Sequence, residues 1–80
     1  MPNLSPNKHD PVLLALGEAI RKARQAKGLS QEQLALLAEA DRSHLGRIER
    51  AENEIAVLLL NRIANALDVT ASQLMNEAGL

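Results

Sequence analysis

The stretch from Ser30 to Arg50 constrains the fold most, because it holds two short helical patterns with almost no chain between them. Ser30 followed three residues later by Gln33 is a capping box, which predicts that a helix begins here. Asp41 is typical of the residue that caps the next helix. Only residues 39–41 separate the two patterns, so we expect the two helices to cross in a tight turn.

The rest of the chain also repeats apolar residues at steps of three and four, which predicts amphipathic helices and not strands. These patterns cover five segments, at about residues 11–27, 31–38, 42–50, 55–67 and 71–78. The side chains expected to face inward are Leu13, Leu16, Ile20, Ala23, Leu34, Leu37, Ala38, Leu45, Ile48, Val57, Leu60, Ile63, Ala64 and Leu67. The predicted fold class is therefore all-α, a compact domain of five helices.

Capping residues and glycines mark the ends of these helices. Asp10 and Pro11 suit the cap and the first position of a helix. Gly28 suits the left-handed position that follows a helix. A second capping box begins at Thr70. Gly17, inside the first pattern, is interpreted as a point of close helix packing.

The 80 residues suffice for one small domain. Residues 1–10 contain two prolines and two asparagines and are predicted to be a flexible arm before a domain at 11–80. Without cysteine the chain can form neither a disulfide nor a thiolate metal site. It has no apolar run of about 18 residues and no signal-peptide pattern, so we expect a soluble intracellular protein with no membrane partner.

Charge is distributed unevenly, although the net charge is only −1. Residues 1–50 hold eight Lys and Arg against six Asp and Glu, a net charge of +2, whereas residues 51–80 are net −3. The small total argues against a protein that coats nucleic acid through charge alone. Any contact with a polyanion is expected in the first 50 residues.

The second helix of the central pair has an unusual outward surface. Its outward positions hold three arginines and two other hydrogen-bonding side chains, namely Arg42, Ser43, His44, Arg47 and Arg50. The major groove of B-DNA, about 12 Å wide, admits one helix, and an arginine there can bond both acceptors of guanine. Gly46 keeps the helix slim between the arginines. A solvated helix face is the alternative, but the paired helices favour base contact by the first four of these residues.

Groups that suit DNA phosphates flank this surface. The unpaired N–H groups of a helix N-terminus attract phosphate, and Ser30 and Gln31 stand at such a terminus. Arg50, at the end of the second helix, is interpreted as a phosphate contact or as ordinary surface charge.

No constellation of catalytic or metal-ligating residues is visible. The two histidines, His9 and His44, are far apart in sequence, and the chain has neither a glycine-rich phosphate loop nor a convincing acid–base pair. The sequence therefore predicts that the protein is not an enzyme and needs no cofactor, metal or small-molecule effector.

Four motifs in order give the chain a family resemblance. They are Ile20-Arg21-x-x-Arg24, then Gly28-Leu29-Ser30-Gln31-Glu32-x-Leu34-Ala35, then Asp41-Arg42-Ser43-x-Leu45-x-x-Ile48-Glu49-Arg50, then Ile63-Ala64-x-Ala66-Leu67-x-Val69. With this spacing, the region from Leu16 to Met75 resembles the lambda-repressor-like helix-turn-helix family, also called Cro/C1 or XRE. Residues 41–53 are similar in particular to the controller proteins of restriction–modification systems.

The resemblance implies a compact five-helix domain that regulates transcription as a homodimer on a palindromic operator in double-stranded DNA. By position, Gln31 in the helix-turn-helix at about 30–50 would contact phosphate and brace the second helix. Arg24 and Glu49 would form an internal ion pair. The residues facing the major groove would be Arg42, Ser43, His44 and Arg47. The family also implies a cytoplasmic, nucleoid-associated protein of a bacterium or phage.

Three places depart from the family pattern. Glu39, in the turn, and Ala51, after the Glu-Arg pair, stand where the family usually has glycine. Ile55 and Ala56 replace the Pro-Ser that often opens the fourth helix. These changes leave open whether the turn is left-handed and how the following loop meets phosphate.

The C-terminal region, at about 55–80, is predicted to dimerise. Leu58 and Leu59 lie off the inward stripe of their helix, and this acidic half of the chain is expected to face away from DNA. The candidate interface residues are Leu58, Leu59, Met75, Ala78 and Leu80. The alternative is that Leu59 borders the core and Leu58 is a single exposed leucine.

An alternative function is a protein-interaction module such as an antitoxin, because a fold does not fix function. RNA polymerase and a cognate toxin are accordingly further candidate partners. The arginine-bearing helix favours DNA, whereas the apolar C-terminal surface suits either role.

Overall fold

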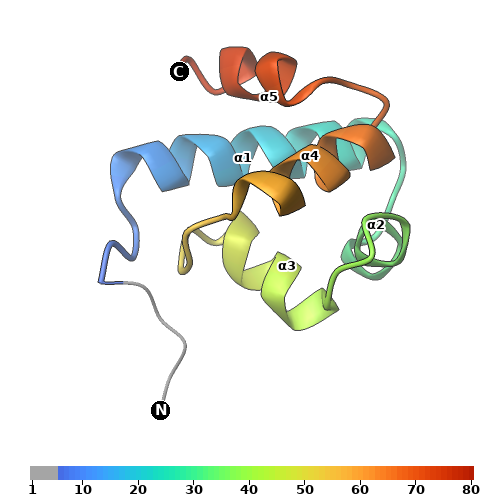
Figure 1. Ribbon diagram of the computed structural model, residues 1–80, viewed down its shortest axis with the longest axis horizontal. Helices are drawn as coiled ribbons and strands as arrows, with labels where there is room; N and C mark the ends of the chain where they lie inside the picture. The colour runs from blue at the N-terminus through green and yellow to red at the C-terminus, as the bar shows by residue number, and fades with distance from the viewer. Residues whose placement is uncertain (1–5) are drawn as a thin grey trace.

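The computed structural model describes residues 6–80, and these form five α-helices without a strand (Figure 1). The helices are α1 (Pro11–Ala26), α2 (Gln31–Leu37), α3 (Arg42–Glu49), α4 (Val57–Ala66) and α5 (Ala71–Glu77). The predicted all-α fold is confirmed, with helix ends shifted by one or two residues. Residues 1–5 of the predicted arm lie outside the described residues.

Side-chain caps determine where four of these helices begin. At α2, Ser30 Oγ accepts the Gln33 backbone N–H at 3.0 Å, and Gln33 Oε1 accepts the Ser30 backbone N–H at 2.8 Å. Thr70 and Gln73 repeat this arrangement at α5. Both predicted capping boxes are therefore confirmed. The aspartates expected to cap α1 and α3 also accept backbone N–H groups of the first turn.

The C-termini of the described helices share one motif. In each, a backbone N–H two residues past the C-cap returns to a carbonyl of the last turn, at 2.8–3.1 Å. This Schellman motif needs one left-handed residue. The residues in that position, with φ between 57° and 78°, are Gly28, Glu39, Ala51, Asp68 and Gly79. The turn and the post-helix loop thus stay left-handed at Glu39 and Ala51, although both lack glycine.

The buried core runs between all five helices. Its members are Leu16, Ile20, Leu34, Ala35, Ala38, Leu45, Ile48, Leu59, Ile63, Ala64, Leu67 and Leu74. The inward face of α4 differs from the prediction, because Leu59 is buried, Leu60 is half-buried and Val57 is exposed. Leu59 lies four residues before Ile63 and Leu60 lies three residues before it. Either spacing places a side chain on the same helix face as Ile63, so Leu59 can face the core as readily as Leu60. On α2, Leu37 is likewise exposed instead of buried.

Gly17 brings α1 against the end of α3, which confirms its interpretation as a packing point. A Cβ atom at this position would lie 2.7 Å from the Glu49 carbonyl oxygen and 2.8 Å from that of Ile48. Only glycine permits this distance, so α1 and α3 approach backbone to backbone. The position of α3 in the molecule depends on this contact.

Residues 6–10, the described part of the predicted arm, form a turn before α1. The His9 backbone N–H donates to the Ala51 carbonyl oxygen at 2.7 Å, which attaches this segment to the loop after α3.

Candidate nucleic-acid interface

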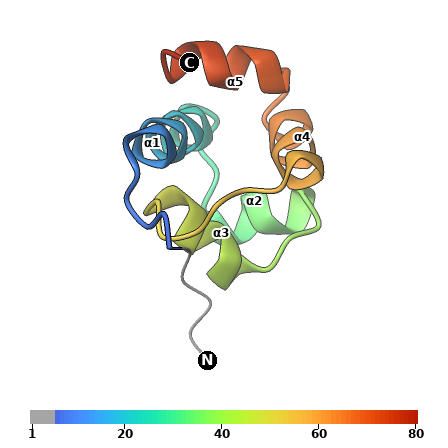
Figure 2. The ribbon, with the colours of Figure 1, turned by 60° about the vertical axis from the view of Figure 1, so that its left-hand side comes forward.

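Helix α3 lies at one end of the molecule and α5 at the other, with α1 and α4 between them (Figures 1 and 2). Leu45 and Ile48 are buried and anchor one side of α3 in the core. The opposite side faces away from the protein. A short helix held in this way can enter a groove of a partner without disturbing the core.

The outward side of α3 carries hydrogen-bond donors. Helical spacing of three and four residues brings Ser43, Arg47 and Arg50 onto one line opposite the buried residues. Arg42 and His44 lie on either side of that line. Arg42, Ser43 and Arg50 are exposed, whereas His44 and Arg47 are half-buried. The structure therefore leaves the α3 residues for which a DNA contact was predicted on the side away from the buried anchor or at its two edges.

Arg47 is held more closely than an ordinary surface arginine. Its Nε is buried and has no hydrogen-bond partner among the described residues, and the same is true of Asn53 Oδ1 in the following loop. The arginine stem consequently packs on the protein and does not extend freely into solvent. Packing of this kind restricts the directions in which the guanidinium group can point.

Glu49, at the end of α3, joins three helices. Its Oε2 accepts from Arg24 Nε of α1 at 2.7 Å, and its Oε1 accepts from Arg24 Nη2 at 3.1 Å and from Gln31 Nε2 of α2 at 3.0 Å. Arg24 Nη1 also donates to the Leu29 carbonyl oxygen at 2.8 Å. The cluster links the first turn of α2 to the last turn of α3.

The side chains of Glu49 and Arg24 in this cluster are almost fully buried. The side chain of Glu49 is only 2% exposed and that of Arg24 is 12% exposed. Loss of one partner would leave a buried charge unpaired, which is far more costly than loss of the pair. The contacts expected from the family resemblance, an Arg24–Glu49 ion pair and a Gln31 brace, are both present in the structure.

Gly46 lies in the middle of α3 beneath two polar side chains. A Cβ atom there would lie 3.1 Å from Arg50 Nη1 and 3.5 Å from Gln31 Oε1. Glycine thus leaves room for Arg50 to fold back along α3 and for Gln31 to reach Glu49. Ser30, by contrast, uses its hydroxyl group for the α2 cap.

Arg50 pairs with Glu52 just beyond α3. Arg50 Nε donates to Glu52 Oε2 at 3.0 Å. This hydrogen bond lowers the pKa of the Glu52 carboxyl group and raises the pKa of Arg50. The positive charges of Lys8 and His9 add to the lowering of the Glu52 pKa. Positive and negative groups therefore alternate at this end of the helix.

One positioning residue was missed by the sequence analysis. Arg62 Nε of α4 donates to the carbonyl oxygen of Ala38, the C-cap of α2, at 3.0 Å. This bond holds the turn between α2 and α3 against α4. The only available signal was that Arg62 is the one basic residue within 51–80.

The predicted dimer surface is only partly free. Leu58 is 74% exposed, Leu80 is also exposed, and Met75 and Ala78 are half-buried. Leu59 is only 6% exposed and belongs to the core, so its inclusion in the interface was wrong.

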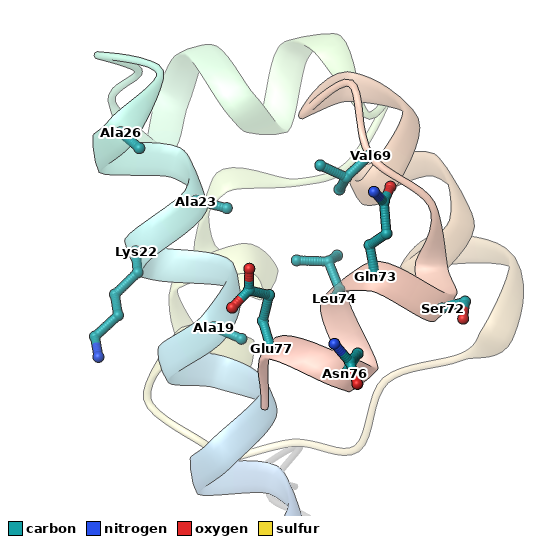
Figure 3. A pocket seen from close by; sticks show the side chains of 10 residues that line it. All are labelled: Ala19, Lys22, Ala23, Ala26, Val69, Ser72, Gln73, Leu74, Asn76 and Glu77. Carbon is teal, nitrogen blue, oxygen red and sulfur yellow. The ribbon is translucent and has the colours of Figure 1, made fainter. Parts of the chain in front are cut away.

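A groove of about 650 Å³ lies between α1 and α5, away from α3 (Figure 3). Alanines of α1 form one wall opposite Val69 and Leu74, and Lys22 extends out of the groove. Across residues 6–80, no group of three His, Asp or Glu side chains lies close enough to hold a metal ion. No helix in the same range is long and apolar enough to cross a membrane.

Comparison with known proteins agrees with this geometry. The helix-turn-helix family matches residues 20–74. The control protein C.SmaI of Serratia marcescens is 35% identical over 65 residues, which cover 81% of this chain and 77% of the relative.

Solved structures give the same result. The restriction–modification controller protein C.AhdI from Aeromonas hydrophila has a TM-score of 0.76 at 40% identity, covering 78% of this chain and 94% of that protein. The clp gene regulator ClgR from Corynebacterium glutamicum has a TM-score of 0.82 at 29% identity, covering 85% and 72%. The chain belongs to the helix-turn-helix family of Cro/C1 (XRE) type, a family of DNA-binding transcription regulators.

Proposed function

We propose that this protein regulates transcription as a homodimer that binds a palindromic operator, with α3 of each protomer in the major groove. The observation that carries the proposal is the outward face of α3, where arginine and hydroxyl donors stand opposite a buried anchor. Base edges in the major groove present acceptors that such donors can read. We assign base contact to Arg42, Ser43, His44 and Arg47.

Phosphate contacts are assigned to Ser30, Gln31 and Arg50. The Gln31 amide nitrogen has two N–H groups, and Glu49 accepts from one of them. The other can donate to a phosphate next to the open N-terminus of α2, where backbone N–H groups also favour an anion. Arg24 and Glu49 act through Gln31, because they fix its amide group relative to α3.

The proposed dimer surface consists of Leu58 in the first turn of α4 and of Met75, Ala78 and Leu80 in and just after α5. It belongs to the net acidic half of the chain, which is suited to a protein partner and not to DNA. Because two relatives are named as controller proteins of restriction–modification systems, control of such a system is the regulatory role we propose.

Selection of bound duplexes from a random DNA library at physiological salt tests this function. The wild type is expected to enrich a palindrome, and the Arg42→Ala/Arg47→Ala variant is expected to lose that enrichment. Each arginine that bonds a base contributes about 1–3 kcal/mol of discrimination.

The matched control is Arg21→Ala/Lys22→Ala, which removes the same charge from the exposed side of α1. It is expected to keep the palindrome. A folded wild type that enriches no sequence would contradict the proposal, and so would loss of enrichment in both variants alike.

A further inference from the structure

The segment before α1 is a turn with a lysine and a histidine at its tip. The Asp10 backbone N–H donates to the Asn7 carbonyl oxygen at 2.9 Å, closing a four-residue turn around Lys8 and His9. His9 has a φ of 64°, as the third residue of a type II turn requires. Both tip residues are exposed.

Two contacts fix this turn beside the C-terminal end of α3. The His9 backbone N–H donates to the Ala51 carbonyl oxygen at 2.7 Å, and Asn7 Nδ2 donates to the Glu54 carboxylate. Ala51 is fully buried and follows α3 after a single residue, so it is a rigid attachment point. Both ribbon views show the dark blue segment next to the yellow loop after α3 (Figures 1 and 2).

The turn changes the charge at this end of the recognition helix. The loop carries Glu52 and Glu54, which by themselves would repel a phosphate backbone. Arg50 pairs with Glu52, the charges of Lys8 and His9 lower the pKa of Glu52, and Asn7 bonds Glu54. Lys8 forms no ion pair with any residue in 6–80, so its ammonium group is available to another partner.

We propose that this turn is part of the DNA interface and that Lys8, with His9, binds a backbone phosphate beyond the C-terminal end of α3. The inference rests on the proposed function. A helix of eight residues is about 12 Å long, similar to the width of the major groove, which is about 12 Å. Groups held just past its end therefore face the sugar–phosphate backbone that borders the groove.

The test compares DNA affinity over a range of salt concentrations for the wild type, Lys8→Gln and Lys22→Gln. The logarithm of the binding constant falls with the logarithm of the salt concentration, and each phosphate contact makes this fall steeper by about 0.9. Lys8→Gln is expected to make it shallower by that amount on operator and unrelated duplexes alike. The ratio of wild-type affinity to Lys8→Gln affinity then falls about threefold between 50 and 200 mM salt.

Lys22→Gln removes the same charge at the groove between α1 and α5 and is expected to keep the wild-type slope. His9→Asn added to Lys8→Gln is expected to lower affinity further without unfolding, because asparagine tolerates the left-handed conformation. If Lys8→Gln and the wild type have equal slopes on a DNA that both bind, this inference is overturned and the proposed function stands. If the wild type binds no duplex, the proposed function itself fails.

Discussion

At Glu39, Ala51 and Asp68 the backbone takes a conformation that glycine adopts without strain. For a residue with a Cβ atom, the left-handed region costs roughly 1–2 kcal/mol. Each of these residues closes a Schellman motif and so directs the chain into the next element. At Glu39 the next element is α3, so the strain is located in the turn that orients the helix proposed to enter the major groove.

Glu39→Gly is expected to stabilise the protein by about 0.5–1 kcal/mol, because relief of strain exceeds the extra chain entropy that glycine loses. In a domain of this size the melting temperature should rise by about 2–8 °C. Glu32→Gly is the matched control, since it makes the same change at an exposed position inside α2, where glycine costs about 1 kcal/mol. The melting temperatures of the two variants, measured by circular dichroism, should thus shift in opposite directions. A loss of stability in both variants would contradict the strain inferred at Glu39.

Among the helices, the contact of α1 with α3 tolerates the least change. Gly17→Ala would place a methyl group 2.7–2.8 Å from two backbone oxygens of α3, which cannot rotate away. We expect a loss of about 1–3 kcal/mol of unfolding free energy, and weaker DNA binding because α3 must shift.

The matched substitution is Gly46→Ala, whose new methyl group would meet only the ends of the flexible Arg50 and Gln31 side chains. Alanine is the better helix former, so this variant should be as stable as the wild type or more stable by up to about 1 kcal/mol. Urea unfolding of the two variants measures the difference. Equal losses would indicate that the cost reflects the helix interior and not the α1–α3 approach.

The sequence was most informative where neighbouring residues decide the structure. The capping boxes at Ser30 and Thr70 depend on side chains three residues apart, and both helix starts were predicted from them. It placed Leu60 on the inward face of α4 where the structure has Leu59, because both lie one helical step before Ile63. The packing of α2 and α5 against α4 makes that choice.

The residues of the candidate site could likewise be predicted within one helix but not between distant segments. The outward line on α3 follows from spacing within one helix, so its residues could be found directly. The Arg24–Glu49 contact joins residues 25 positions apart, and only the family resemblance indicated it. The bonds from His9 to Ala51 and from Arg62 to Ala38 connect distant segments through backbone groups, which no side-chain pattern marks.

At the scale of the whole molecule, the two ends have different tasks in the proposed function. Helix α3 and the turn at residues 6–10 lie at one end, and α5 lies at the other (Figure 2). The longest dimension of the chain is 32 Å. Two protomers side by side can therefore present their α3 helices about 34 Å apart, one turn of DNA, as a two-fold operator requires.

Leu58→Asn tests the proposed pairing, because in a two-fold dimer each substitution acts twice. Burial of one leucine contributes about 1.5–3 kcal/mol, so the dimer dissociation constant should rise about 100-fold or more. Leu36→Asn is the matched control, since Leu36 is 79% exposed on α2, outside the proposed interface. Sedimentation velocity over a concentration series should separate the two variants, with only Leu58→Asn becoming monomeric.

The same variant should keep its affinity for an isolated half-site and lose tight binding to the full palindrome. If Leu58→Asn dimerises like the wild type, α4 does not supply the interface, and the exposed leucine needs another partner.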